Sequence, residues 1–128
     1  ISLLIVLVLV TACAPPEEVL LTLGEEAYTR SELKAFGTTS VDYTNNDGET
    51  TTYQGVLLSA VLEDADVADA GATITFIAAD GYKAEMPANE ALACGNCIIA
   101  IDDVSLRLVM PDFSSKLQVR DLISIIVQ

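Results

Sequence analysis

The chain has 128 residues, of which 52% are hydrophobic and 5% aromatic, and its formal net charge is −13. This length fits one domain with a modest core. The acids are dispersed, so we interpret them as a solvated surface, and such a surface repels nucleic acid and anionic lipid headgroups. The absence of histidine excludes Ser-His-Asp and Cys-His catalytic arrangements, together with the commonest general base near neutral pH.

The first twelve residues, ISLLIVLVLVTA, are almost wholly apolar and carry no charge. This segment is too short to span a bilayer as a permanent helix. It matches the hydrophobic region of a secretory signal, here without the basic start because the sequence begins at Ile1. The end of this segment and the residue after it, Val10 to Cys13, resemble a bacterial lipobox. In a lipobox, a signal peptidase cuts before the cysteine and a lipid is attached to the cysteine sulfur.

We therefore expect residues 1–12 to be a signal peptide, residues 13–18 a lipidated tether beginning at Cys13, and residues 19–128 the folded domain. The lipid on Cys13 would hold the domain in the cell envelope, on the extracytoplasmic side of a bacterial membrane. The other interpretation is a buried N-terminal helix with an incidental cysteine.

The rest of the chain predicts a single β-rich α+β domain with a mixed sheet, about seven or eight strands and three short helices. Strands are expected where apolar or threonine-rich residues run between turn signals, at Val19–Leu23, Thr38–Thr44, Glu49–Tyr53, Thr73–Ala78, Tyr82–Met86, Cys97–Ile101, Ser105–Met110 and Leu122–Val127. Helices are expected after the capping-box pair Thr29 and Glu32, over Ser59–Ala65 and over Pro87–Ala93.

Two turn signals fix hairpins within this pattern. The dipeptide Asp80-Gly81 predicts a hairpin in which Ile74 and Phe76 point to one side. The stretch Asn45–Gly48 predicts a second hairpin loop. It is not a calcium loop, because the first and twelfth ligand positions would fall on Tyr43 and Gln54.

Cys94 and Cys97 form a C-x-x-C pair with three open interpretations. A redox motif needs a following helix, whereas Ile98–Ile101 predicts a strand. A zinc site lacks a second pair or a histidine. In an oxidising compartment a local disulfide is therefore favoured, with buried free thiols next and a redox or metal role last.

Four segments together resemble the oxidoreductase molybdopterin-binding domain, the fold of the sulfite oxidase family. Tyr53–Leu62 is similar to its Tyr-x-Gly-Val-x-Leu opening, and Phe76–Tyr82 contains its Asp-Gly-Tyr turn. Arg107–Pro111 resembles its Arg-Leu-Val-x-Pro segment, and Lys116 with Val119 its closing Lys-Trp stretch. The resemblance spans the whole expected domain and is greatest to small, stand-alone, secreted members of that family.

The sequence departs from the family where the cofactor would bind. Family enzymes hold molybdenum through a cysteine thiolate before the Tyr-x-Gly-Val motif, and here Gly37–Thr52 contains no cysteine. They also use histidines and several arginines on the pterin phosphate and the substrate; this chain has no histidine and only Arg30, Arg107 and Arg120. A phosphate dianion needs such donors or a glycine-rich loop.

We therefore expect a lipid-anchored binding or accessory module that uses a family-type cleft without metal or cofactor, and we assign no catalytic residue. Its partners would be the membrane, through the lipid, and a small anionic ligand or a partner protein. The alternative is a molybdopterin-dependent oxidoreductase with atypical ligation.

The resemblance places the ligand at a cleft near Asp80, Tyr82, Arg107 and Lys116. Arg107 lies inside an apolar strand, where an unpaired cation is costly. Two interpretations stay open: a salt bridge to Asp80 or to Asp103, or an anion site walled by Tyr82 and by Tyr53.

Overall fold

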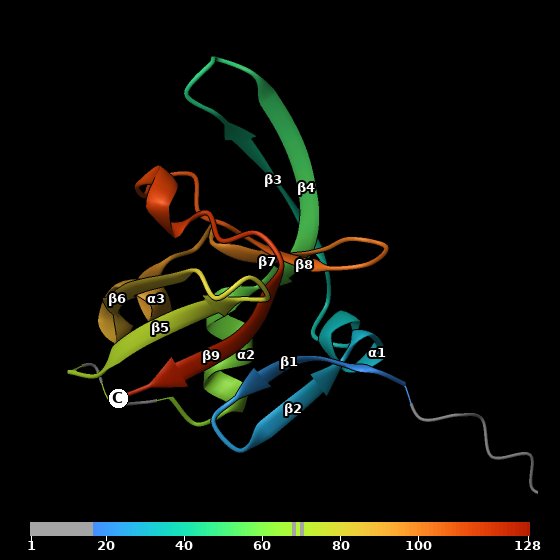
Figure 1. The fold of residues 1–128 in the computed structure, drawn as a ribbon, viewed down its shortest axis with the longest axis vertical. Helices are drawn as coiled ribbons and strands as arrows, with labels where there is room; N and C mark the ends of the chain where they lie inside the picture. Colours follow the sequence, from blue (N-terminus) through green and yellow to red (C-terminus); the bar gives the residue numbers. More distant parts are fainter. Residues whose placement is uncertain (1–16, 68, 70) are drawn as a thin grey trace, which may run out of the picture.

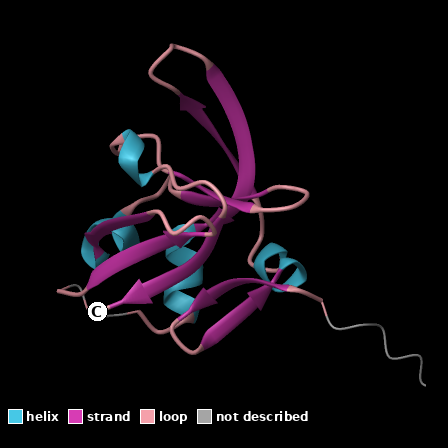
Figure 2. Cartoon of the chain, in the orientation of Figure 1, coloured by secondary structure: helices cyan, strands magenta, loops and turns pink. Residues whose placement is uncertain are grey.

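The computed structural model of the chain describes residues 17–67, 69 and 71–128. Within this part, nine strands form two sheets, and three short α-helices and one 3-10 turn connect them (Figures 1 and 2). The strands are β1 Val19–Leu23, β2 Glu26–Thr29, β3 Thr39–Thr44, β4 Thr50–Leu57, β5 Thr73–Ala78, β6 Lys83–Pro87, β7 Ile98–Ile101, β8 Leu106–Val109 and β9 Leu122–Val127. The helices are α1 Arg30–Lys34, α2 Leu58–Asp64, α3 Ala88–Ala93 and the 3-10 turn η1 Ser115–Leu117. The predicted β-rich α+β fold is confirmed.

The larger sheet has the strand order β2-β1-β9-β5-β6. Its strands are antiparallel except at the centre, where β1 runs parallel to β9 and pairs Thr22 with Ser124 and Leu23 with Ile125. The first and last strands of the domain therefore lie side by side inside the sheet. The smaller sheet, β3-β4-β7-β8, is antiparallel throughout.

The β5–β6 hairpin forms as its sequence predicts. Gly81 adopts a φ of 90°, a left-handed conformation that glycine takes without a steric penalty, and the Tyr82 carbonyl accepts the Ala78 amide at 2.9 Å. The alternation of β5 buries Ile74 and Phe76 completely. This strand therefore supplies the centre of the core.

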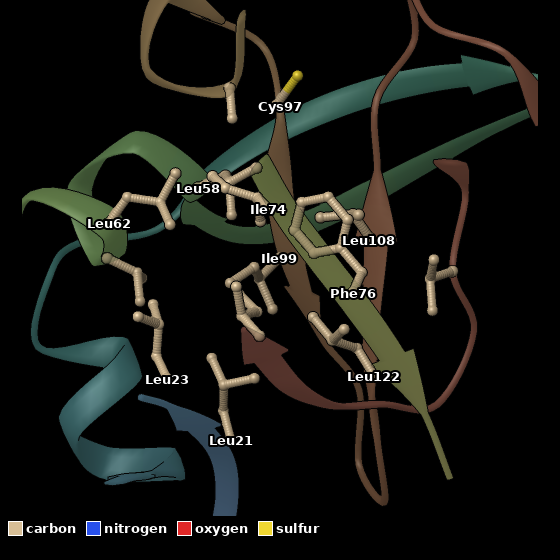
Figure 3. Packing of buried hydrophobic residues seen from close by; sticks show 14 of the residues in the cluster. Leu21, Leu23, Leu58, Leu62, Ile74, Phe76, Cys97, Ile99, Leu108 and Leu122 are labelled. Carbon is tan, nitrogen blue, oxygen red and sulfur yellow. The ribbon is translucent and has the colours of Figure 1, made fainter. Parts of the chain in front are cut away.

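Both sheets contribute to one principal core. Figure 3 shows side chains from β1, β5 and β9 meeting side chains from β7, β8 and α2. The completely buried members include Leu21, Leu62, Phe76, Ile99 and Leu108. Burying a large aliphatic or aromatic side chain stabilises a fold by about 1.5–3 kcal/mol, so these contacts hold the two sheets together.

The helices are short and begin at positions set by local sequence. The Thr29 hydroxyl accepts the Glu32 amide and the Glu32 carboxylate accepts the Thr29 amide, which is the predicted capping box. Helix α2 buries Val61 and Leu62, as the spacing of its apolar residues predicts. Helix α3 begins directly after Pro87, close to the predicted start.

The β3–β4 hairpin projects from the body of the domain and carries its loop at the far end (Figure 1). Only the last residues of β4, Gly55–Leu57, pair with β7, so among the described residues no further strand lies beside the outer half of the hairpin. Gly55 allows this junction, because an added Cβ would lie 2.1 Å from the Ile99 carbonyl oxygen. The close approach of β4 to β7 at this junction therefore requires glycine.

Candidate functional site

A polar cavity of about 280 Å³ lies between the β3–β4 hairpin, strand β8 and the segment 115–120. Its lining residues are mostly polar and include two arginines and two tyrosines. They are Tyr43, Asn45, Asn46, Glu49, Thr51, Tyr53, Arg107, Ser115, Gln118 and Arg120.

The register of the hairpin decides which of its side chains reach this cavity. Residues directly opposite in an antiparallel pair share a face, and Tyr43 pairs with Thr51 while Val41 pairs with Tyr53. The other face is a polar ladder in which Thr44 and Thr50 are joined by a hydroxyl hydrogen bond of 2.8 Å. The hairpin therefore turns its aromatic face to the cavity and its threonine face to solvent.

Arg107 lines the cavity from strand β8. Its neighbours Leu106 and Leu108 are buried in the core, so the alternation of β8 places Arg107 on the opposite face. Its guanidinium carbon lies 4.9 Å from the centre of the Tyr53 ring, a cation–π contact. Its Nε is buried and, within the described part of the chain, has no hydrogen-bond partner.

Arg120 lies directly opposite Arg107. The two residues form an isolated antiparallel bridge, which the hydrogen bond from the Leu108 amide to the Val119 carbonyl supports at 2.8 Å. Bridge partners share a face, and like charges at such positions destabilise the pair. Arg120 is not among the site residues predicted from the sequence, because it lies thirteen positions from Arg107, in a charged turn before the closing strand. The weak signal that could have identified it was the scarcity of arginine in so acidic a chain.

The segment that carries Arg120 is fixed to the end of β8 by one side chain. The Gln118 amide accepts from the Met110 backbone N–H and donates to the Met110 carbonyl, each at 2.7 Å. The Gln118 side chain is thus occupied by backbone groups although it lines the cavity. The role of the Gln118 side chain is to hold the segment 115–120 in place as one wall of the cavity.

The remaining predicted ligand residues form a second group outside the lining of this cavity. The Tyr82 hydroxyl donates to the Lys116 carbonyl at 2.7 Å, and the Asp80 carboxylate accepts the Tyr82 amide at 3.0 Å. The structure thus brings Tyr53 to Arg107, and Asp80 and Tyr82 to Lys116, as two groups. The Tyr82 hydroxyl is bonded to the backbone of η1, and Tyr82 is not among the residues that line the cavity around Arg107. That Tyr82 and Tyr53 jointly wall one anion site on Arg107 stays a prediction.

Neither Asp80 nor Asp103, the expected partners of Arg107, forms a side-chain contact with it in the described part of the chain. The carbonyl oxygens of Asp102 and Asp103 accept hydrogen bonds from Arg30, the latter at 2.9 Å. The Asp80 carboxylate is the acceptor in its own turn. Over the described ranges no carboxylate forms an ion pair with Arg107, so its visible partner is the Tyr53 ring.

Cys94 and Cys97 are joined by a disulfide between the end of α3 and the start of β7. Cys97 is completely buried, and its carbonyl accepts the Leu58 amide at 2.9 Å. The intervening Asn96 donates to the Asp112 carboxylate at 2.9 Å. A strand follows the pair, so the thiolate-stabilising helix of a redox motif is absent at this position.

The donor set of the described residues does not fit molybdenum bound in the family's manner. Such a site requires a free thiolate, and both described cysteines are consumed by the disulfide. No group of three or more potential metal ligands occurs in this part of the chain, and the full sequence has no histidine. The cavity arginines are the most basic feature available, and they lie without a neighbouring thiol.

Cys13 and the predicted signal peptide lie outside the described residues. The described portion contains no helix with the length and apolarity needed to cross a membrane.

No known protein family model and no curated protein sequence matches this chain. Its structure is similar to the crystal structure of the sulfane dehydrogenase SoxCD from Paracoccus pantotrophus, with a TM-score of 0.67 and 17% sequence identity. The similarity covers 85% of this chain but only 37% of that one, so this chain spans well under half of its structural neighbour. The domain thus has the sulfite oxidase-like fold.

Proposed function

We propose that this chain is a lipid-anchored, extracytoplasmic binding or accessory module, built on the sulfite oxidase-like fold and functioning without bound molybdenum. The observation that carries this proposal is the chemistry of its donor set. The thiols of Cys94 and Cys97 are oxidised to a disulfide, and no histidine exists to replace them.

The cavity supports a binding role. A hollow of about 280 Å³ with two guanidinium groups is suited to a small anion, because arginine forms paired hydrogen bonds with oxyanions. The long-range field of a chain with net charge −13 repels anions, so this local positive pair is the feature that would retain one. Asp80, Tyr82 and Lys116 are proposed as a neighbouring surface that contacts a partner protein.

The anchor follows from the lipobox-like Val10–Cys13. A single acyl chain binds a membrane only marginally, whereas the two chains of a diacylglycerol are sufficient for stable attachment. The acidic domain gains nothing from anionic headgroups, so the lipid would be its only hold on the membrane.

The test is the metal content of the protein expressed from residues 1–128 in a bacterial host with an active molybdopterin pathway and purified in detergent. We expect far less than one molybdenum per chain by elemental analysis. A sulfite oxidase-family enzyme produced in the same host, and loaded with metal, is the control for cofactor supply.

The alternative, a molybdopterin-dependent oxidoreductase with atypical ligation, is favoured by one observation, the likeness of the fold to SoxCD. Stoichiometric molybdenum in the purified chain would establish that alternative and overturn the proposed module.

A further inference from the structure

We propose that the cavity between the β3–β4 hairpin and residues 115–120 binds a short organic dicarboxylate, with Arg107 and Arg120 each holding one carboxylate. This inference rests on the proposed binding function and names the class of ligand. Dicarboxylates of three to five carbons, such as malonate, succinate and glutarate, represent that class.

The first argument is the cost of the arginine pair. The chain has six lysines and arginines against nineteen acids, yet two of these cations are bridge partners on one face of the sheet. Placing like charges at such positions opposes folding. A bound anion between them removes this repulsion and replaces it with attraction.

The second argument is the shortage of internal counterions. Glu49 is the sole acid in the cavity lining, and it is located at the hairpin end, where its backbone amide is held by Asn45 at 3.0 Å. Two arginines against one carboxylate leave the lining with one net positive charge. Within the described residues, therefore, the cavity retains capacity for an added anion.

The third argument concerns how far each arginine is exposed to solvent. Arg107 is half-buried, with its Nε enclosed and its guanidinium against the Tyr53 ring, whereas Arg120 is exposed to solvent. The two arginines therefore differ in their exposure to solvent. A dicarboxylate offers a separate acidic group to each arginine, whereas a single tetrahedral ion must share its charge between them.

The fourth argument concerns the connecting frame. Tyr43 and Tyr53 give the cavity an aromatic wall, against which a short carbon chain packs. The volume of about 280 Å³ is at the lower limit of small-molecule sites, so only a small frame fits. The hydroxyls of Thr51 and Ser115 and the amide of Asn46 are additional neutral donors in the lining.

The experiment is calorimetric titration of the detergent-purified full chain with malonate, succinate and glutarate. Propionate tests the need for the second charge, and inorganic phosphate and sulfate test the tetrahedral-ion alternative. We expect at least one dicarboxylate to bind with a Kd of about 1 mM or tighter. Propionate, phosphate and sulfate should bind at least about ten times more weakly.

The decisive variant is Arg120→Gln, because Arg120 is exposed and its loss leaves no hole in the core. Affinity for the dicarboxylate should fall by about 10- to 100-fold, the effect of one charge-assisted contact. Lys83→Gln is the matched control, since it removes one exposed cation outside the cavity lining and should change affinity less than about twofold. Arg107→Met should lose affinity at least as strongly as Arg120→Gln.

A second readout separates binding from a structural role. Without ligand, Arg120→Gln should raise the unfolding temperature slightly, because it removes the repulsion, and it should lose the stabilisation that the dicarboxylate gives the parent chain. Lower ligand-free stability with unchanged affinity would overturn the proposal. Equal losses in Arg120→Gln and Lys83→Gln would also overturn it, as would tighter binding of phosphate or sulfate, or a Kd weaker than about 1 mM for every dicarboxylate. In molybdenum-free protein, these results would reject the dicarboxylate site and leave the metal-free module standing.

Discussion

The Tyr28 hydroxyl donates a hydrogen bond of 2.8 Å to the Asp64 carboxylate, and so connects strand β2 to the end of helix α2. Tyr28 is only 3% exposed and packs at 6.0 Å from the Phe36 ring. Burial, followed by the bond to Asp64, raises the pKa of Tyr28 well above its usual value. This one residue therefore couples an edge strand of the larger sheet to a helix and makes that coupling sensitive to pH.

Tyr28→Phe should lower the free energy of unfolding at pH 7 by about 1 kcal/mol, the net worth of one such hydrogen bond. Because the pKa of Tyr28 is raised in the folded state, Tyr28 makes its full contribution to the free energy of unfolding below about pH 10. This contribution declines as the pH rises further. The difference between the parent and the variant should therefore narrow above about pH 10. Urea unfolding of the parent and the variant at pH 7 and at pH 10.5 measures the difference between their unfolding free energies at each pH. A difference that is larger at pH 10.5 than at pH 7 would contradict this account.

Gly55→Ala should be among the most destabilising single substitutions in the chain. The added Cβ would lie 2.1 Å from the Ile99 oxygen and 2.5 Å from the Ala100 Cα, and these are backbone atoms of a neighbouring strand that cannot move aside. We expect a loss of about 3 kcal/mol or more, at the upper end of overpacking costs. Gly71→Ala, whose nearest neighbour atom is at 3.4 Å, is the matched control and should lose far less by denaturant titration.

The Cys94–Cys97 disulfide should contribute modestly to stability. Its loop is short, and closing four residues removes unfolded-state entropy worth about 2 kcal/mol in the chain-entropy estimate. The double variant Cys94→Ala and Cys97→Ala should fold, and its unfolding free energy should match that of the reduced parent. Loss of dicarboxylate binding in a fully folded double variant would instead assign the pair a functional role.

Tyr82→Phe tests whether the Tyr82–Lys116 group is separate from the arginine cavity. The variant loses the hydrogen bond to the Lys116 carbonyl and should cost about 1 kcal/mol in unfolding free energy. Dicarboxylate affinity should stay within about threefold of the parent, since Tyr82 is not in the cavity lining. Lys116→Gln is the control, because it keeps the backbone carbonyl that accepts the Tyr82 hydrogen bond and should leave the unfolding free energy unchanged. A large loss of dicarboxylate affinity in both variants would show that the Tyr82–Lys116 group and the arginine cavity form one site.

Cys13→Ala should abolish lipid attachment. Cells expressing the parent chain and grown with radiolabelled palmitate should incorporate label into it, and the variant should incorporate none. The double variant Cys94→Ala and Cys97→Ala is the control, because it removes two cysteines without affecting the lipobox-like segment. Unchanged labelling of Cys13→Ala would show that the anchor is assigned to the wrong residue.

Local sequence predicted the elements that local chemistry determines. Asp80-Gly81 specified the β5–β6 hairpin, and Thr29 with Glu32 specified the start of α1. Strand β2 was not predicted, because Glu26–Thr29 has no clear alternation and becomes extended only by pairing with β1. The 3-10 turn η1 was likewise missed, since three residues carry no periodic signal.

The sequence indicated only some of the residues that line the arginine cavity. Arg107 was identified because a cation inside an apolar strand is conspicuous, and Tyr53 because it belongs to the recognised motif. Arg120 could not be found this way, because its relation to Arg107 depends on a long-range bridge that no spacing rule predicts. The division of the expected cleft into two groups is also a tertiary result, set by where η1 meets Tyr82.

The parallel pairing of β1 with β9 has a consequence for the order in which the chain can fold. Thr22 and Ser124 are 102 positions apart, yet their hydroxyls are joined by a hydrogen bond of 3.0 Å. A chain synthesised from its N-terminus exposes β1 long before β9 exists, and contacts between such distant segments form slowly. The larger sheet cannot close around its centre until the last residues emerge, so a nascent chain that lacks them remains open. Such delay would be compatible with the proposed export, in which the polypeptide is threaded unfolded through a membrane pore before it becomes compact.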